Sequence, residues 1–233
     1  MTLSTKQAII VRGGWDGHQP VEATDKFVPF LEEHGFTVTV FEGSSVYADA
    51  AIMADVDLIV QCNTMNTIEK AEIAGLRAAV LAGTGLAGWH GGIADSYRDC
   101  ADYLQLVGGQ FAHHPGKHPS DIVGEQSDNY IPYRIDVLPA AASHPIMQGI
   151  DSFDVVTEQY WVLNDDYIDV LATTTLAARD WDAWNRPITS PAIWTRQWGL
   201  GHIFVSTAGH NVDVLDNPII TTIIERGLLW ASR

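Results

Sequence analysis

The apolar positions in the first half of the chain form short runs that alternate with amphipathic stretches of helical spacing. The runs typical of buried strands are residues 7–12, 36–41, 57–61 and the stretch that begins at Gly85. The stretches with helical spacing are residues 21–34, which stop before Gly35, residues 68–81, which stop before Gly83, and residues 93–106. Strands that alternate with helices of this length predict right-handed βαβ units. We therefore expect a parallel sheet with helices on both faces.

The second half of the chain has a different pattern. Residues 111–128 contain too many histidines and prolines for a helix, and the later runs are short and extended: 133–138, 151–161, 169–175, 192–197 and 202–207. Gly199 and Gly201 predict a hairpin turn between the last two runs. A closing helix is expected over 217–232, with Asn217 as its N-cap and Pro218 at its first position. The sequence thus predicts one α/β domain over residues 1–233, with antiparallel strands extending the sheet.

Composition excludes several classes of protein. The chain has 13 basic and 29 acidic residues, a net charge of −16, which repels nucleic-acid phosphates. It has no apolar run of the roughly 18 residues that a membrane span needs, and residues 1–7 lack the apolar core of a signal peptide. Its two cysteines are not spaced as a disulfide or metal framework. We expect a cytoplasmic protein without nucleic-acid or membrane partners, and the acidic, aromatic-rich composition is compatible with a homodimer.

The stretch from Gly85 to Gly92 contains the first candidate for a functional residue, His90. Small apolar residues lead into Trp89, His90 follows, and Gly91 and Gly92 precede the next helical stretch. Glycines on both sides of His90 permit a strained strand–turn–helix connection that pushes one side chain beyond the sheet. This is the geometry of a nucleophile elbow, here carrying an imidazole. Such strain serves function more often than packing.

Two further histidines also follow predicted strands. His18 comes after the first strand, and His210 comes after the strand 202–207. Ligands of open α/β sheets bind outside the carboxyl ends of the strands, so we expect His18, His90 and His210 to meet at one edge. For each histidine alone, the alternative to a role in the site is a solvated or capping role. For His18 we give the two roles equal weight.

A series of motifs then follows in order along the chain. They are Gly88-Trp89-His90-Gly91-Gly92, Phe111 with His114-Pro115, Ser143-His144-Pro145-Ile146, Glu158-Gln159-Tyr160, Pro191-Ala192-Ile193-Trp194-Thr195, Gly199-Leu200-Gly201-His202-Ile203-Phe204, Gly209-His210 and Leu229-Trp230-Ala231. In order and spacing the set resembles the ThuA-like family, the trehalose-utilisation group of the class I glutamine amidotransferase-like superfamily. The resemblance implies a flavodoxin-like three-layer sandwich with an extended sheet and a link to sugar metabolism.

The sequence departs from the superfamily at one decisive position. Amidotransferases of this superfamily carry cysteine at the elbow, whereas this chain has His90. Cys62 and Cys100 lie outside the turn, so glutamine hydrolysis through a thioester has no nucleophile. We therefore expect no amidotransferase activity.

The resemblance also places Glu158 near the elbow. His90, His210 and Glu158 are then the candidate catalytic residues and the candidate ligands of a divalent metal, with zinc favoured. Without a metal, the same groups can act as general acid and base on a sugar carbon beside a carbonyl. Both alternatives predict an enzyme of the isomerase, hydratase or hydrolase type, acting on a keto-sugar or a glycoside such as a trehalose derivative.

Further side chains are candidates for binding that carbohydrate: Trp15, Asp16, His18, Trp89, Asp95, His114 and Tyr160. Each has a structural alternative. The tryptophans and Tyr160 can fill the core, Asp16 can form a turn, and Asp95 can stabilise the first turn of a helix.

Two rival functions stay open at this point. One is a sugar-binding or regulatory protein that kept the pocket and lost the chemistry. The other is a hydrolase with a different nucleophile, for which Ser96 is the nearest serine in sequence to His90.

Overall fold

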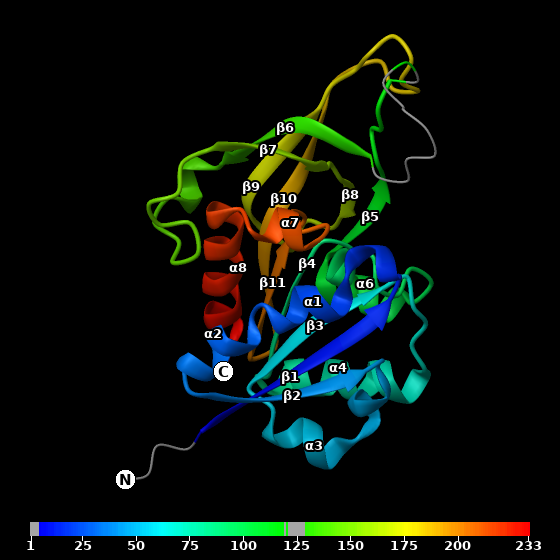
Figure 1. Cartoon of the computed structure of the whole chain (residues 1–233). Coiled ribbons are helices and arrows are strands. Elements are labelled where there is room, and N and C mark those ends of the chain that lie inside the picture. The colour runs from blue at the N-terminus through cyan, green and yellow to red at the C-terminus, as the bar shows by residue number, and fades with distance from the viewer. Residues whose placement is uncertain (1–4, 119, 121–128) are drawn as a thin grey trace.

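The computed structural model of the chain describes residues 5–118, 120 and 129–233. Figure 1 shows one long twisted sheet with helices against both faces. Among the described residues, nine strands form this sheet in the order β2 (Phe36–Glu42), β1 (Lys6–Gly14), β3 (Leu58–Thr64), β4 (Gly85–Trp89), β11 (Gly201–Ser206), β10 (Ile188–Trp198), β9 (Asp169–Leu176), β6 (Tyr130–Val137) and β7 (Phe153–Glu158). A separate antiparallel pair consists of β5 (Gly109–His113) and β8 (Trp161–Asn164).

The two halves of the large sheet differ in strand direction. Strands β2, β1, β3, β4 and β11 are parallel to their neighbours, in the 2-1-3-4-5 order of flavodoxin-like folds. From β11 outward, β10, β9, β6 and β7 pair antiparallel. The predicted fold, a flavodoxin-like sandwich with antiparallel extension strands, is therefore confirmed.

Alternating residues of the central strands explain the three layers. On β1, Ala8 and Ile10 face one hydrophobic core, while Ile9 and Val11 face the other. The first core is completed by α1 (Pro20–Asp25), α2 (Val28–Glu33), α7 (Val212–Leu215) and α8 (Pro218–Ala231). The second is completed by α3 (Ala50–Asp55), α4 (Lys70–Ala82), α5 (Gly91–Ala94) and α6 (Ala101–Val107). Short 3₁₀ turns occur at Asp16–His18, Ser45–Ala48 and Pro139–Ala141.

Two predicted helices are broken in the structure. The stretch 21–34 divides into α1 and α2, because Pro29 has no N–H to continue the helical bonds. The stretch 93–106 divides after α5. There the carbonyls of Asp95 and Ser96 accept the N–H groups of Met65 and Asn66, both at 2.8 Å, instead of helical donors. Tertiary hydrogen bonds thus override a helical pattern.

Other boundaries follow the predictions or refine them. Helix α8 begins where expected, and the Asn217 side chain accepts the N–H groups of Ile219 and Ile220. The extended stretch 151–161 passes from β7 in the large sheet to β8 in the small one. Helix α3 was not predicted. Of the irregular stretch 111–128, residues 119 and 121–128 lie outside the described residues. Within the described chain, no helix is long and apolar enough to cross a bilayer.

Candidate functional site

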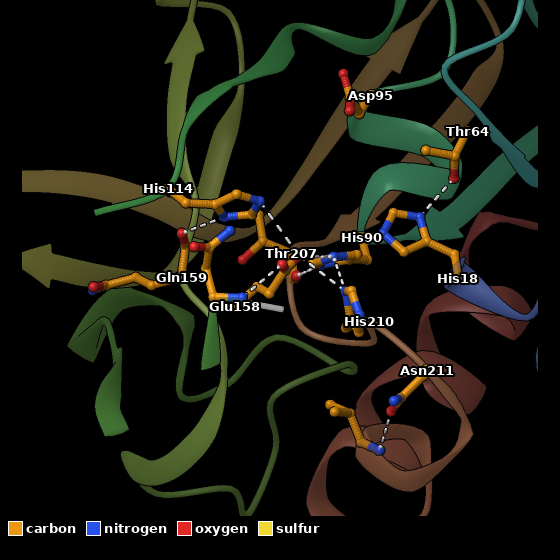
Figure 2. Close-up of polar contacts among 12 residues, drawn as sticks. His18, Thr64, His90, Asp95, His114, Glu158, Gln159, Thr207, His210 and Asn211 are labelled. Atoms are coloured by element: carbon orange, nitrogen blue, oxygen red, sulfur yellow. Dashed lines mark hydrogen bonds and ion pairs between the residues drawn. The ribbon is translucent and has the colours of Figure 1, made fainter. Parts of the chain in front are cut away.

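Histidines from three strand ends meet at the carboxyl edge of the parallel half of the sheet. His18 lies in the 3₁₀ turn after β1, His90 follows β4, and His210 follows β11. Figure 2 shows their imidazoles beside Glu158, the last residue of β7, and His114, which follows β5. The predicted convergence of the three histidines is confirmed, and the antiparallel extension of the sheet supplies the carboxylate.

The backbone of His90 has the strained conformation that the glycines around it predict. Its φ is 48° and its ψ is −141°, a region that residues with a side chain rarely occupy. The His90 N–H donates to the carbonyl of Ser206 at 2.6 Å, and its own carbonyl accepts the N–H of Ala94 at 2.9 Å. Strand β11 and helix α5 therefore hold the elbow from both sides.

One carboxylate oxygen lies at the centre of the cluster. Glu158 Oε2 is 2.9 Å from His210 Nδ1, 3.3 Å from His90 Nε2 and 3.4 Å from His114 Nε2. His210 Nδ1 and His90 Nε2 are themselves 3.2 Å apart. The other oxygen, Glu158 Oε1, accepts the backbone N–H of Asn129 at 3.2 Å. We call His18, His90, His114, Glu158 and His210 the His/Glu cluster.

Backbone carbonyls determine which imidazole nitrogens carry hydrogen. His90 Nδ1 is 2.7 Å from the carbonyl oxygen of Thr207, and His114 Nδ1 is 3.2 Å from that of Gln159. A carbonyl can only accept, so each Nδ1 is the protonated nitrogen. The Nε2 atoms of neutral His90 and His114 then direct lone pairs at Glu158. His18 is held in a similar way, with Nδ1 2.8 Å from Thr64 Oγ1.

Burial fixes the charge of the cluster. His90 and His210 are 1% exposed and Glu158 is 4% exposed. Burial lowers the pKa of His90 to about 4 and, together with the neighbouring histidines, that of His18 to about 2. Burial would raise the pKa of Glu158, but the hydrogen bond with His210 acts in the opposite direction, and the pKa of this carboxyl is held well below its usual range. At neutral pH an ionised carboxylate thus faces uncharged His90.

This arrangement is suited to a cation. Lone pairs of His90 and His114 converge on a carboxylate, and a positive ion among them would relieve the repulsion. A tetrahedral zinc ion with bonds of about 2.0–2.1 Å separates its ligand atoms by about 3.4 Å. The separations among His90, Glu158 and His210 are 2.9, 3.2 and 3.3 Å. Ligand atoms from these residues and His18 all lie within 4.8 Å of one another.

Aromatic rings surround the His/Glu cluster. Tyr160 is buried, with its ring centroid 4.2 Å from that of His90. Trp15 is 38% exposed, and its ring centroid lies 4.8 Å from that of His18 and 6.1 Å from that of His210. Both were predicted from the sequence. Tyr130, whose ring centroid is 5.3 Å from that of His210, was not predicted, because no motif singles it out.

Three predicted residues do not join the cluster. Trp89 is buried in the core, with its ring centroid 4.9 Å from that of Phe27, as its structural alternative predicts. Asp95 is buried and forms a two-pronged ion pair with Arg98, at 2.5 and 2.6 Å. Asp16 is exposed in the turn that also contains His18. A role for Trp89 in binding substrate stays a prediction, and its packing matches the core-filling alternative.

Neither serine nor cysteine chemistry is supported at the elbow. Ser96 Oγ donates to the carbonyl of Gly92 at 2.7 Å and accepts from Gln61, which places it within the packing of α5. Cys62 is buried on β3, and burial raises the pKa of its thiol to about 12. A thiol in that state is a poor nucleophile at neutral pH.

The fold and the site define a flavodoxin-like α/β protein with a histidine elbow and a buried His/Glu cluster. The chain belongs to the ThuA family, described as trehalose utilisation, which it matches over residues 7–231. The family confirms the resemblance drawn from the motifs, and with it a carbohydrate-related role is plausible. No curated protein matches the chain significantly.

Several solved structures share the fold at low sequence identity. A ThuA-like protein from Bacteroides uniformis has a TM-score of 0.74 and 15% identity, with 99% of this chain and 93% of that chain covered. A ThuA-like protein from Parabacteroides merdae has a TM-score of 0.71 and 15% identity, covering 98% and 90%. A protein described as cytoplasmic from Salmonella typhimurium has a TM-score of 0.63 and 12% identity, covering 97% and 100%.

Proposed function

We propose that the protein is an enzyme of carbohydrate metabolism that acts on a keto-sugar or glycoside, such as a trehalose derivative, at a metal-binding His/Glu cluster. The observation that carries the proposal is the position of Glu158 Oε2, which lies within 3.4 Å of nitrogens from His90, His114 and His210. A site that only binds sugar hydroxyls needs hydrogen bonds, but it does not need several imidazoles gathered around one carboxylate. Membership of the family described as trehalose utilisation supports the substrate class.

Zinc is the cation that these donors fit best. His90 Nε2, His210 Nδ1 and Glu158 Oε2 are the proposed ligands, with His18 and His114 beside them. Nitrogen and carboxylate donors in such a set are typical of catalytic zinc sites, in which a carbonyl commonly accepts the other ring hydrogen of a histidine ligand, as the Thr207 carbonyl does for His90. When bound, the ion would polarise a carbonyl oxygen or acidify a water molecule.

Without a metal, the side chains of the cluster would act instead as proton acceptors, because a bound ion would occupy the lone pairs of His90 Nε2 and Glu158 Oε2. Ionised Glu158 and neutral His90 both carry lone pairs at neutral pH, because the pKa of each is low. Either group can take the proton from a sugar carbon beside a carbonyl and return it to the neighbouring atom. We assign the general-base role to this pair and a positioning role to His210, whose Nδ1 contacts both.

The rim of the cluster supplies candidate substrate contacts. Trp15 is the predicted tryptophan that is both exposed and beside the histidines, so we propose that a sugar ring stacks on it. Asp16, from the same turn, can accept a hydroxyl hydrogen. Tyr160 is buried against His90, and we therefore propose that it packs the imidazole in place.

Metal analysis tests the proposal directly. We expect the purified protein, loaded with zinc and dialysed, to retain about one zinc ion per chain, measured by inductively coupled plasma mass spectrometry. Glu158→Gln should retain much less, whereas Glu32→Gln, on the exposed surface of α2, should match wild type. Excess zinc at about 100 times its Kd should add about 2.7 kcal/mol to the free energy of unfolding. Turnover of 3-keto sugars by the loaded enzyme is the accompanying activity measurement.

Burial favours a second candidate, a sugar-binding protein without catalysis. His90 and His210 are 1% exposed, which limits direct contact with a substrate. Binding of sugars without zinc and without turnover would favour this candidate over the enzyme.

A further inference from the structure

A cavity of about 610 Å³ lies where the antiparallel extension of the sheet opens. Strands β6 and β9 pair only at Asp136 with Thr173 and at Val137 with Ala172, so their remaining residues are not joined to each other. The volume is within the range of about 300–1,000 Å³ that is usual for small-molecule sites. The described residues of the cavity wall include none of the His/Glu cluster. The cavity is therefore a separate site.

Part of the cavity wall is apolar. Aromatic, aliphatic and proline side chains form this part: Pro115, Tyr130, Ile131, Pro132, Tyr133 and Trp181. Trp181 is held by the Arg179 guanidinium, 5.1 Å from its ring centroid, and by the His118 ring, which meets it edge-on at 4.1 Å. The hydroxyl of Tyr133 donates to the carbonyl of Glu158 at 3.3 Å. Rings that are already held in place lose little entropy when the ring of a ligand packs against them.

The charged residues of the cavity wall are mostly basic. Lys117, Arg134 and Arg179 line the cavity together with a single carboxylate, that of Asp136. The whole chain has the opposite balance, with 13 basic and 29 acidic residues. A cleft in which one sign of charge dominates raises the local concentration of ligands of the opposite sign. The wall thus favours an anion in a protein whose net charge repels anions.

Ion pairs of these arginines do not remove that preference. Arg134 pairs with Asp136 at 3.1 Å and with Asp154 at 3.4 Å, and all three side chains are about half exposed or more. Pairs as exposed as these contribute little energy, so a bound anion can replace one of them. Arg179 pairs with Asp182 at 2.8 Å. Neither Asp154 nor Asp182 lines the cavity, so their carboxylates do not face a ligand there.

Three side chains of the wall can donate hydrogen bonds to an anion. The contacts of Arg134 with described residues use Nε and Nη1, which leaves Nη2 as a donor. His118 Nδ1 accepts the backbone N–H of Ser120 at 3.1 Å, so the hydrogen of the neutral imidazole is on Nε2. The ammonium group of Lys117 is the third donor. Hydrogen bonds from charged donors to a carboxylate or phosphate are stronger than those between neutral groups.

We propose that the cavity beside Trp181 binds a small organic anion, with an apolar ring against the aromatic part of the wall and a carboxylate or phosphate group toward the basic side chains. The site is distinct from the His/Glu cluster, and the inference does not depend on the proposed function.

Ligand-observed NMR titration of the full-length protein with phenyl phosphate, benzoate and uncharged benzyl alcohol tests this site. The three probes share one ring and differ in the group attached to it. We expect both anions to bind, and benzyl alcohol to bind at least about tenfold more weakly. Added salt should weaken the binding of the anions, because it screens their attraction to the basic residues. The tighter of the two anions identifies the group that the site prefers.

Variants of the wall locate the binding. Arg134→Ala should weaken binding of the anions by about two- to fivefold, as expected for one exposed charge contact, and the double variant Lys117→Ala/Arg134→Ala should weaken it further. Ala177→Trp, which fills an exposed edge of the cavity, should abolish binding. Lys70→Ala, on the exposed surface of α4, is the matched control and should bind as wild type does.

Three results would overturn the proposal. The first is a wild-type protein that binds neither anion at millimolar concentration. The second is binding that Ala177→Trp and the double variant leave unchanged in proteins with the wild-type circular dichroism spectrum. The third is benzyl alcohol that binds as tightly as the anions, because the cavity would then select an apolar ring without regard to charge.

Discussion

The Nδ1 hydrogen of His90 is donated to the carbonyl of Thr207 across 2.7 Å, joining the elbow after β4 to the loop after β11. This bond fixes the tautomer, so the lone pair on Nε2 points at Glu158. The arrangement is that of a metal-ligating or proton-accepting histidine oriented by a backbone carbonyl. The elbow that carries cysteine in the amidotransferases thus presents a buried imidazole here.

Replacing His90 should remove activity while the fold persists. His90→Asn lacks the imidazole but keeps a polar side chain at this strained position. We expect turnover of a 3-keto sugar to fall by about 10²–10⁴-fold for His90→Asn and for His90→Ala. Circular dichroism should show a wild-type spectrum. His34→Ala, at an exposed histidine, is the matched control and should keep full activity; equal activity in all variants would contradict the role of His90.

Local patterns predicted most of the fold because the parallel strands contain short apolar runs or, in β2, an alternation of apolar and polar residues. Every residue of β3 is buried, and the apolar run within residues 57–61 predicts that strand. The broken helices were missed for different reasons. Pro29 is visible in the sequence and should have ended a helix. The break after α5 depends on Met65 and Asn66, which are distant in sequence, so no local signal reveals it.

The sequence predicts the part of the site that lies at the ends of the parallel strands. His18, His90 and His210 all follow parallel strands, and topology alone brings them together. Glu158 ends an antiparallel strand, and only the family resemblance indicated its place. The sequence offers Trp89 as a sugar-stacking residue because an aromatic face lies beside polar His90, but the same pattern fits a tryptophan that fills the core, and only the structure shows that it packs there.

The two cysteines should differ sharply in reactivity. Burial raises the pKa of Cys62 to about 12, so at pH 8 only about one part in ten thousand is thiolate, and the thiol is also 2% exposed. Cys100 is partly exposed. Titration of the native protein with Ellman's reagent at pH 8 should therefore modify one thiol quickly and the second only in denaturant. Cys100→Ser should eliminate the fast phase; a fast phase that survives it would show that Cys62 is accessible.

The cap of the closing helix should contribute measurably to stability. Asn217 Oδ1 accepts the N–H groups of Ile219 at 2.9 Å and Ile220 at 3.4 Å. Asn217→Ala should cost about 1 kcal/mol in the free energy of unfolding, which lowers Tm by about 2–4 °C in a domain of this size. Asn217→Ser, which can cap in the same way, should stay near wild type. Thermal unfolding followed by circular dichroism measures both, and equal losses in the two variants would assign the effect to something other than capping.

The glycine after the elbow should control the position of His18. A Cβ atom at Gly91 would lie 2.5 Å from His18 Cε1 and 3.0 Å from Thr64 Cγ2, so Gly91→Ala must displace the imidazole. We expect a loss of about 1–3 kcal/mol in the free energy of unfolding, as for other overpacked sites. Zinc affinity should fall as well, because His18 belongs to the group of potential ligands.

A double-mutant cycle separates this clash from a general helix effect. In a His18→Ala background the ring is absent, so Gly91→Ala should cost at least about 0.5 kcal/mol less than it does in wild type, as expected for residues in contact. Urea unfolding of the four proteins gives the coupling energy, and zinc titration of the same proteins gives the effect on the site. If the losses in the free energy of unfolding are additive, the cost of Gly91→Ala comes from the backbone at residue 91 or from a clash with Thr64. His18 would then be positioned independently of the elbow.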